Sequence, residues 1–154
     1  MEKVKKYYLA YGSNLNIPQM EMRCPTAKPL GTGYIRGYEL LFKGSKTGSY
    51  LTIEERDGGM VPVVVWEVAE SDEAALDRYE GFPVFYYKKE LRLRCRGIRS
   101  GRSRIVTAFV YIMDETRTLG RPTDYYLRVC REGYEQFGFD PAILMQAVQR
   151  STQS

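Results

Sequence analysis

The feature that most constrains the fold is a series of short apolar and β-branched runs separated by glycine-rich breaks. Runs of this kind, bounded by turn residues, are typical of consecutive strands in a sheet. Glycine is most frequent in the breaks at residues 44–48 and 57–59. The pattern predicts about six strands, at residues 7–11, 34–42, 50–54, 61–68, 91–96 and 105–113.

Helices are expected between and after these strands. Asn16, Ser71 and Thr123 are residue types that cap helix N-termini, and each precedes a segment suited to a helix. Gly81, with a proline two residues later, is a typical end for the second helix, and Pro141 opens a last one. Strands and helices that follow one another without a linker or repeat predict an α+β fold with a mostly antiparallel sheet.

A chain of 154 residues is expected to form one domain. We assign that domain to residues 1–150 and expect residues 151–154 to be a frayed tail. The N-terminus is charged but lacks the apolar region and cleavage site of a signal peptide, and the composition argues against a membrane span. A cytoplasmic protein with no membrane partner is therefore expected.

The sequence contains no histidine. This excludes Ser-His-Asp and Cys-His catalysis, histidine-ligated zinc sites and the commonest general base. Cys24, Cys95 and Cys130 are far apart and form no C-x-x-C pair, so neither a disulfide framework nor a thiolate metal site is expected. Proton transfer must therefore be carried out by another side chain, and no metal is predicted.

Positive charge is concentrated in one segment of the chain. The 23 Lys and Arg exceed the 19 Asp and Glu by four, and six arginines lie within residues 92–104. Clustered arginines can bind nucleic acid. Their spacing at every second residue also suits the solvated face of a strand, where charge discourages edge-to-edge pairing. We prefer the second interpretation and expect no nucleic-acid partner.

A short polar loop follows the first predicted strand. Its residues are Tyr11, Gly12, Ser13, Asn14 and Leu15. A loop between a strand and a helix can direct several backbone N–H groups at one anion, although the same composition also suits an ordinary turn. It lacks the pattern of a nucleotide-binding P-loop. If the loop is a binding site, its N–H groups converge on a point that a carboxylate can reach.

Glu80 is the candidate acid–base residue. It lies in the last turn of a predicted helix, beside Gly81 and close to several aromatic residues. The negative end of the helix and the apolar neighbours both act to raise the pKa of a carboxyl group at this position. A solvated glutamate at a helix end is the alternative interpretation. With no histidine present, Glu80 is the side chain best suited to exchange a proton near neutral pH.

Several segments in order resemble the γ-glutamylcyclotransferase-like family over about residues 7–138. The specific parts are the Y-G-S-N-L loop at residues 11–15 and the L-D-x-Y-E-G helix end at residues 76–81. Either segment alone is a weak signal, but their order and spacing together are specific. Further matching segments are Cys24-Pro25-Thr26-Ala27, the strand at residues 63–68, and Tyr126 seven residues before Gly133.

The resemblance implies a small, mixed β-barrel with flanking helices and a cavity at one barrel mouth. It also implies that the loop from Tyr11 to Leu15 holds the α-carboxylate of a glutamyl group through backbone N–H groups. Glu80 matches the catalytic glutamate of the family, and Tyr87 and Tyr126 match its two site tyrosines.

The implied reaction is intramolecular. The α-amine of a γ-glutamyl compound attacks its own γ-carbonyl, which yields 5-oxoproline and releases a free amine or amino acid, with Glu80 moving the proton and no cofactor. The leaving group is left open, because it depends on the loops at residues 44–48, 57–60 and 114–122. The oligomeric state is also open. The alternative function is a non-catalytic module that binds a γ-glutamyl or amino-acid ligand.

Overall fold

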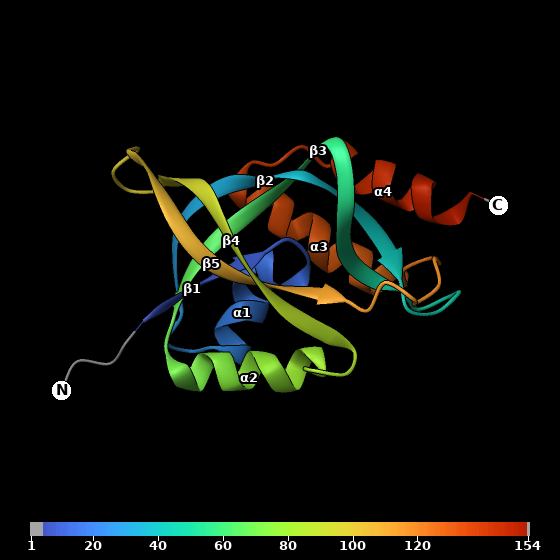
Figure 1. The fold of residues 1–154 in the computed structure, drawn as a ribbon, viewed down its shortest axis with the longest axis horizontal. Coiled ribbons are helices and arrows are strands. Elements are labelled where there is room, and N and C mark those ends of the chain that lie inside the picture. The colour runs from blue at the N-terminus through green and yellow to red at the C-terminus, as the bar shows by residue number, and fades with distance from the viewer. Residues whose placement is uncertain (1–4, 154) are drawn as a thin grey trace.

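A computed structural model describes residues 5–153, and its strands close into a barrel (Figure 1). The order around the barrel is β1, β3, β2, β4, β5. Neighbouring strands are antiparallel except β1 and β5, which are parallel and pair at Tyr8 and Phe109. The predicted mixed, mostly antiparallel barrel is therefore confirmed. The strands are β1 (Lys6–Ala10), β2 (Lys28–Lys43), β3 (Tyr50–Val68), β4 (Tyr86–Gly97) and β5 (Ser103–Met113).

Helices flank the barrel and begin close to the predicted caps. The Asn16 side chain accepts a hydrogen bond from the Gln19 N–H, and the Thr123 hydroxyl accepts one from the Tyr126 N–H. The prediction of Ser71 as a cap is wrong, because this helix begins at Glu70 and its N-cap is Ala69, two residues earlier. The helical elements are the 3-10 turn η1 (Ser13–Leu15), α1 (Ile17–Arg23), α2 (Glu70–Glu80), α3 (Asp124–Phe137) and α4 (Ala142–Thr152).

The two strands predicted at residues 50–54 and 61–68 form the single strand β3. The glycine-rich break between them is a bend within the paired strands β2 and β3. Gly58 and Gly37 have φ angles of 78° and 81°, and the register shifts between Arg36 and Tyr38. Positive φ angles are easily adopted only by glycine. These glycines therefore allow both strands to bend together as a β-bulge, where the sequence suggested a turn.

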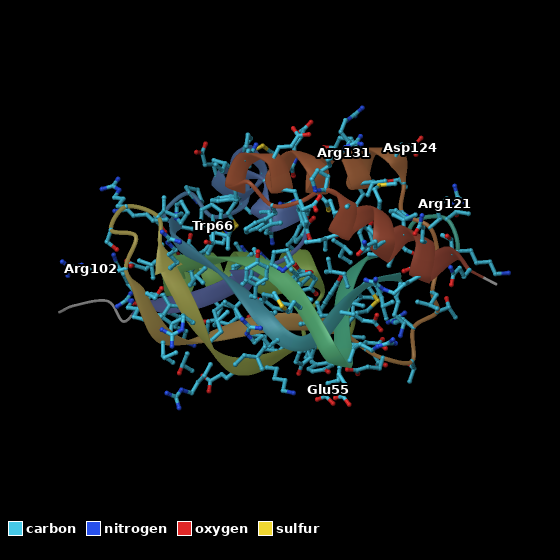
Figure 2. All side chains as sticks on the ribbon, turned by 90° about the horizontal axis from the view of Figure 1, so that it is seen from above. Glu55, Trp66, Arg102, Arg121, Asp124 and Arg131 are labelled. Atoms are coloured by element: carbon cyan, nitrogen blue, oxygen red, sulfur yellow. The ribbon has the colours of Figure 1, made fainter. Side chains whose placement is uncertain are left out.

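The core lies between the barrel and the helices that cover it. Trp66 of β3 is buried beneath the helices (Figure 2) and meets Phe137 of α3 edge to face, with ring centroids 6.4 Å apart. Helix α3 also approaches η1 very closely. A Cβ atom on Gly133 would lie 2.6 Å from the Cβ of Leu15, closer than side chains pack. Only glycine at this position allows α3 and η1 to be so close.

The prediction that residues 151–154 are frayed is wrong for Ser151 and Thr152. Both belong to α4, and Ser151 is buried with its hydroxyl donating to the Ala147 carbonyl and accepting from the Phe42 N–H. A buried N–H needs a partner, so this contact fixes the end of the helix on β2. The last residue, 154, lies outside the described part of the chain.

The arginine-rich segment forms the exposed end of the β4–β5 hairpin. Within residues 5–153, none of its six arginines forms an ion pair with an acidic side chain. Figure 2 shows Arg102 of this hairpin at the opposite end of the molecule from Arg121. The expected absence of a nucleic-acid partner stays a prediction.

Among the described helices, none is both long and apolar enough to span a bilayer.

We expect Gly133→Ala to destabilise the protein. Alanine favours helix by about 1 kcal/mol, but overpacking at a contact of 2.6 Å costs about 1–3 kcal/mol. The thermal midpoint should therefore fall, although alanine has a higher helix propensity than glycine. Glu135→Ala, on the exposed face of the same helix, is the matched control and should change stability by less than about 0.5 kcal/mol. A higher midpoint for Gly133→Ala would contradict the close packing of α3 on η1.

Candidate active site

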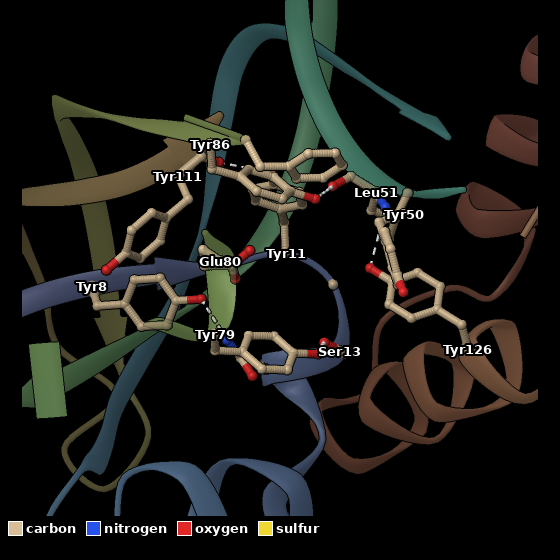
Figure 3. A pocket seen from close by; sticks show the side chains of 13 residues that line it. Tyr8, Tyr11, Ser13, Tyr50, Leu51, Tyr79, Glu80, Tyr86, Tyr111 and Tyr126 are labelled. Atoms are coloured by element: carbon tan, nitrogen blue, oxygen red, sulfur yellow. Dashed lines mark hydrogen bonds between the residues drawn. The ribbon is translucent and has the colours of Figure 1, made fainter. Parts of the chain in front are cut away.

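A small cavity brings together residues from β1, β3, β4, β5, η1, α2 and α3. Its volume is about 180 Å³, and tyrosine is the residue type that occurs most often in its wall. Figure 3 shows the Glu80 carboxylate between the rings of Tyr8, Tyr11 and Tyr79, with Tyr50 and Tyr126 across the cavity. The lining residues are Tyr8, Tyr11, Gly12, Ser13, Asn14, Tyr50, Leu51, Tyr79, Glu80, Phe85, Tyr86, Tyr111 and Tyr126.

Glu80 is the acidic side chain of this cavity. It is the last residue of α2, and Gly81 ends the helix in the left-handed conformation with φ 66°. Within residues 5–153, no hydrogen bond or ion pair involves the Glu80 carboxylate. Burial raises the pKa of Glu80 to about 7, and the charge of Arg23 opposes this shift. A carboxyl group with this pKa can both accept and return a proton near neutral pH.

The loop after β1 contributes Tyr11, Gly12, Ser13 and Asn14 to the wall, but not Leu15. The Leu15 side chain is fully buried, and its N–H donates to the Gly12 carbonyl over 3.0 Å. The predicted role of Leu15 in the binding loop is therefore not supported. The N–H groups of Gly12, Ser13 and Asn14 take part in none of the hydrogen bonds found within residues 5–153. Three backbone donors thus remain available beside the cavity.

Side-chain hydrogen bonds hold this loop in place. The Tyr11 hydroxyl donates to the Tyr111 carbonyl over 2.7 Å, and the Asn14 amide donates to the Tyr8 hydroxyl over 3.0 Å. The hydroxyls of Ser13 and Tyr79 are 3.1 Å apart. Because these partners belong to β1, β5 and α2, the loop is fixed relative to the barrel and to the helix that carries Glu80.

Tyr126 lies in the cavity wall, as the family resemblance implied. Its hydroxyl accepts a hydrogen bond from the Leu51 N–H over 3.1 Å, and the Tyr86 hydroxyl donates to the Leu51 carbonyl over 2.8 Å. A Cβ atom on Gly12 would lie 3.1 Å from the Tyr126 hydroxyl. Glycine at position 12 therefore leaves room between the loop and this tyrosine.

Tyr87 does not lie in the cavity wall, so the prediction made for it is wrong. Its hydroxyl donates to Glu115 instead. Neighbouring residues of a strand face opposite sides of the sheet. Tyr86 shares its side of β4 with Lys88, which contacts Asp77 of α2 at 2.9 Å, whereas Tyr87 lies on the other side. The tyrosine of β4 in the cavity is therefore Tyr86.

Arg23 is a residue of the site that the sequence analysis missed. This last residue of α1 donates to the Asn14 side chain over 2.7 Å, and its guanidinium lies 3.6 Å from the centre of the Tyr79 ring. It supplies positive charge near Glu80 and orients Asn14. No sequence motif marked it, because its partners come from separate segments.

Ion pairs fix helix α2 against β4 and β5. The Tyr111 hydroxyl donates to Asp77 over 2.6 Å, and Lys88 contacts both Asp77 and Glu73, at 2.9 and 2.7 Å. Asp77 is one helical turn before Glu80, so these contacts determine where the catalytic candidate lies.

Across residues 5–153, no cluster of three or more cysteine, aspartate or glutamate side chains is arranged to hold a metal ion.

Comparisons with known proteins agree with this arrangement. A family model described as gamma-glutamyl cyclotransferase, AIG2-like, matches residues 8–128. A gamma-glutamylcyclotransferase from Bos taurus is 36% identical over 81 residues, a match that covers 48% of this chain and 43% of the bovine protein. The matched part thus spans less than half of the bovine relative.

Solved structures share the fold. One named gamma-glutamyl cyclotransferase superposes with a TM-score of 0.79 at 23% identity, covering 98% of this chain and 90% of that one. An uncharacterized protein from Homo sapiens gives 0.75 at 24% identity, covering 97% and 89%. A gamma-glutamyl cyclotransferase specific to glutathione from yeast gives 0.61 at 12% identity, covering 97% of both chains. Since the family model matches well over half of its residues, the chain belongs to the family of AIG2-like gamma-glutamyl cyclotransferases.

Proposed function

We propose that this protein converts γ-glutamyl compounds into 5-oxoproline and a free amine, with Glu80 as general base and general acid. The observation that carries the proposal is a half-buried carboxylate that has no hydrogen-bond or ion-pair partner within residues 5–153, in a cavity whose other lining side chains are uncharged. Membership of the family and the name of the bovine relative support the same reaction class.

The free backbone donors of the loop suit the α-carboxylate of the substrate. N–H groups of Gly12, Ser13 and Asn14 carry no protein partner within residues 5–153, and successive N–H groups of a loop form a common anion site. A carboxylate held there places the rest of the glutamyl group within the small cavity beside Glu80. The hydroxyls of Tyr79 and Tyr126 can donate to polar atoms of the substrate from the wall.

Glu80 then moves protons between two nitrogens of one substrate. It takes a proton from the α-ammonium group, and the freed nitrogen attacks the γ-carbonyl carbon. Glu80 returns that proton to the leaving nitrogen as the old C–N bond breaks. The new ring nitrogen loses its second proton to the departing amine, so that the products carry all the protons of the substrate. Because both reacting groups belong to one molecule, holding it curled supplies much of the rate.

Replacing the base should separate chemistry from folding. We expect Glu80→Gln to lower the rate of 5-oxoproline formation about 10²–10⁴-fold, because a positioned acid–base group typically contributes that much. The measurement is turnover on γ-glutamyl compounds together with the thermal midpoint of the same preparation. Glu70→Gln, at the exposed start of the same helix, is the control and should keep full activity. Full activity in a folded Glu80→Gln protein would contradict the role of Glu80.

The pH profile provides a second test. Because Glu80 acts as a base in its ionised form, kcat/KM should rise with pH and level off above an apparent pKa of about 7. The measurement is initial rate at low substrate concentration between pH 5 and 9. A profile without this limb, in a protein that remains folded throughout, would assign the proton transfer to another group.

Stability should respond to the same ionisation. The folded protein holds the Glu80 proton up to a pKa of about 7, whereas the unfolded chain releases it near the usual value of 4.5. Stability is therefore lost as pH rises from 4.5 to 7. The Gln variant lacks this loss, so its thermal midpoint should match the wild type near pH 4.5 and exceed it above pH 7. A difference that does not vary with pH would show that Glu80 titrates normally.

A further inference from the structure

Two loops beside the cavity form a single fixed platform. They span residues 44–49 and 114–121, and backbone hydrogen bonds connect them. A Cβ atom on Gly120 would lie 1.8 Å from the Ser45 carbonyl oxygen, so the loops meet without room for a side chain there. The platform is therefore a rigid part of the site surroundings. The backbone pairs, donor first, are Gly44–Thr118, Ser49–Arg121, Gly120–Phe42 and Arg121–Lys46, at 2.8–3.1 Å.

Arg117 projects from this platform toward the edge of the cavity. Its guanidinium lies 4.5 Å from the centre of the Phe85 ring, and Phe85 is part of the cavity wall. Within residues 5–153, Arg117 forms no ion pair with an acidic side chain. It is half-buried, so its position is held by packing.

The acidic neighbours of Arg117 accept hydrogen bonds from other residues and none from its guanidinium group. Asp114 accepts hydrogen bonds from the hydroxyl and the N–H of Thr116, and these bonds, together with the charge of Arg117, lower its pKa. Glu115 accepts a hydrogen bond from the Tyr87 hydroxyl. The guanidinium thus retains donors for an anion that comes from outside the protein.

The cavity wall has exposed residues at two places. Tyr79 is 44% exposed and lies at the binding loop, with its hydroxyl 3.1 Å from that of Ser13. The other place is the edge at Tyr50 and Phe85, where a substrate held by the loop can emerge. The inner wall is formed by buried residues such as Tyr8 and Asn14, whereas Tyr50 is 46% exposed and Phe85 is partly exposed. A γ-glutamyl group with its α-carboxylate at Gly12–Asn14 fills the inner part. A leaving group that emerges at Phe85 comes within reach of Arg117, whose guanidinium lies over that ring.

We propose, on the basis of the proposed function, that Arg117 binds the carboxylate of the leaving group and so selects γ-glutamyl α-amino acids over γ-glutamylamines. Arginine pairs with a carboxylate through charge-assisted and often bidentate hydrogen bonds. Binding at the edge of the cavity leaves the chemistry at Glu80 unchanged, so the effect of Arg117 falls mainly on KM.

The test compares two substrates that differ only in one carboxylate, γ-glutamylalanine and γ-glutamylethylamine. The wild type should favour γ-glutamylalanine in kcat/KM by roughly tenfold or more, the range of a hydrogen bond between charged groups. Arg117→Gln should lose most of that ratio by raising KM for γ-glutamylalanine, with little change for γ-glutamylethylamine. Arg117→Lys should keep part of it, because the charge remains. Arg121→Gln, an exposed arginine of the same platform, is the control and should keep the full ratio.

The outcomes separate this assignment from the proposed function. Product from both compounds at similar kcat/KM, or an equal loss on both in Arg117→Gln, would overturn the assignment of Arg117 and leave the reaction in place. An equal loss would mean that the arginine only supports Phe85. No 5-oxoproline from either compound would overturn the proposed function, and this inference with it.

Discussion

The position of the site depends on how helix α2 is attached to the barrel. Asp77 accepts a hydrogen bond from Tyr111 and pairs with Lys88, which also pairs with Glu73. Although burial opposes the charged form, Glu73 and Asp77 raise the pKa of Lys88. Removing one partner of such a cluster leaves a poorly solvated charge, which is costly. The helix is thereby held in one place, and its last residue, Glu80, enters the cavity.

The other side chains that line the cavity around Glu80 are uncharged, and most of them are tyrosines. Burial raises the pKa values of Tyr8, Tyr11 and Tyr126 well above the usual range of tyrosine, so their hydroxyls stay protonated at neutral pH. They can therefore donate hydrogen bonds but do not compete for the proton that Glu80 exchanges. A cavity of this kind raises the pKa of a carboxyl group by poor solvation while still accommodating a polar molecule.

The two arginines near the cavity differ in their effect on Glu80. Arg23 is close enough to lower the pKa of Glu80, yet burial still dominates. Arg117 contacts Phe85 and is not among the groups that shift the pKa of Glu80. A cation in direct contact with Glu80 would favour its ionised form and weaken it as a base. The edge of the cavity can therefore present positive charge to a leaving group without shifting the pKa of Glu80.

The sequence by itself determined the features that depend on local order along the chain. Strand runs and helix caps, each read within a few residues, led to an α+β fold with a mostly antiparallel sheet. The glycine that ends α2 and the absence of histidine led to Glu80, and the barrel was implied by the family resemblance. Which side of β4 faces the cavity was decided only by the tertiary structure. Alternation separates Tyr86 from Tyr87, but only the packing of α2 on one side of β4 shows that Tyr86 belongs to the wall. The positions of Arg23 and Arg117 beside the cavity could likewise not be predicted from the sequence. Their contacts join segments far apart in the chain, and such contacts exist only once the barrel has closed.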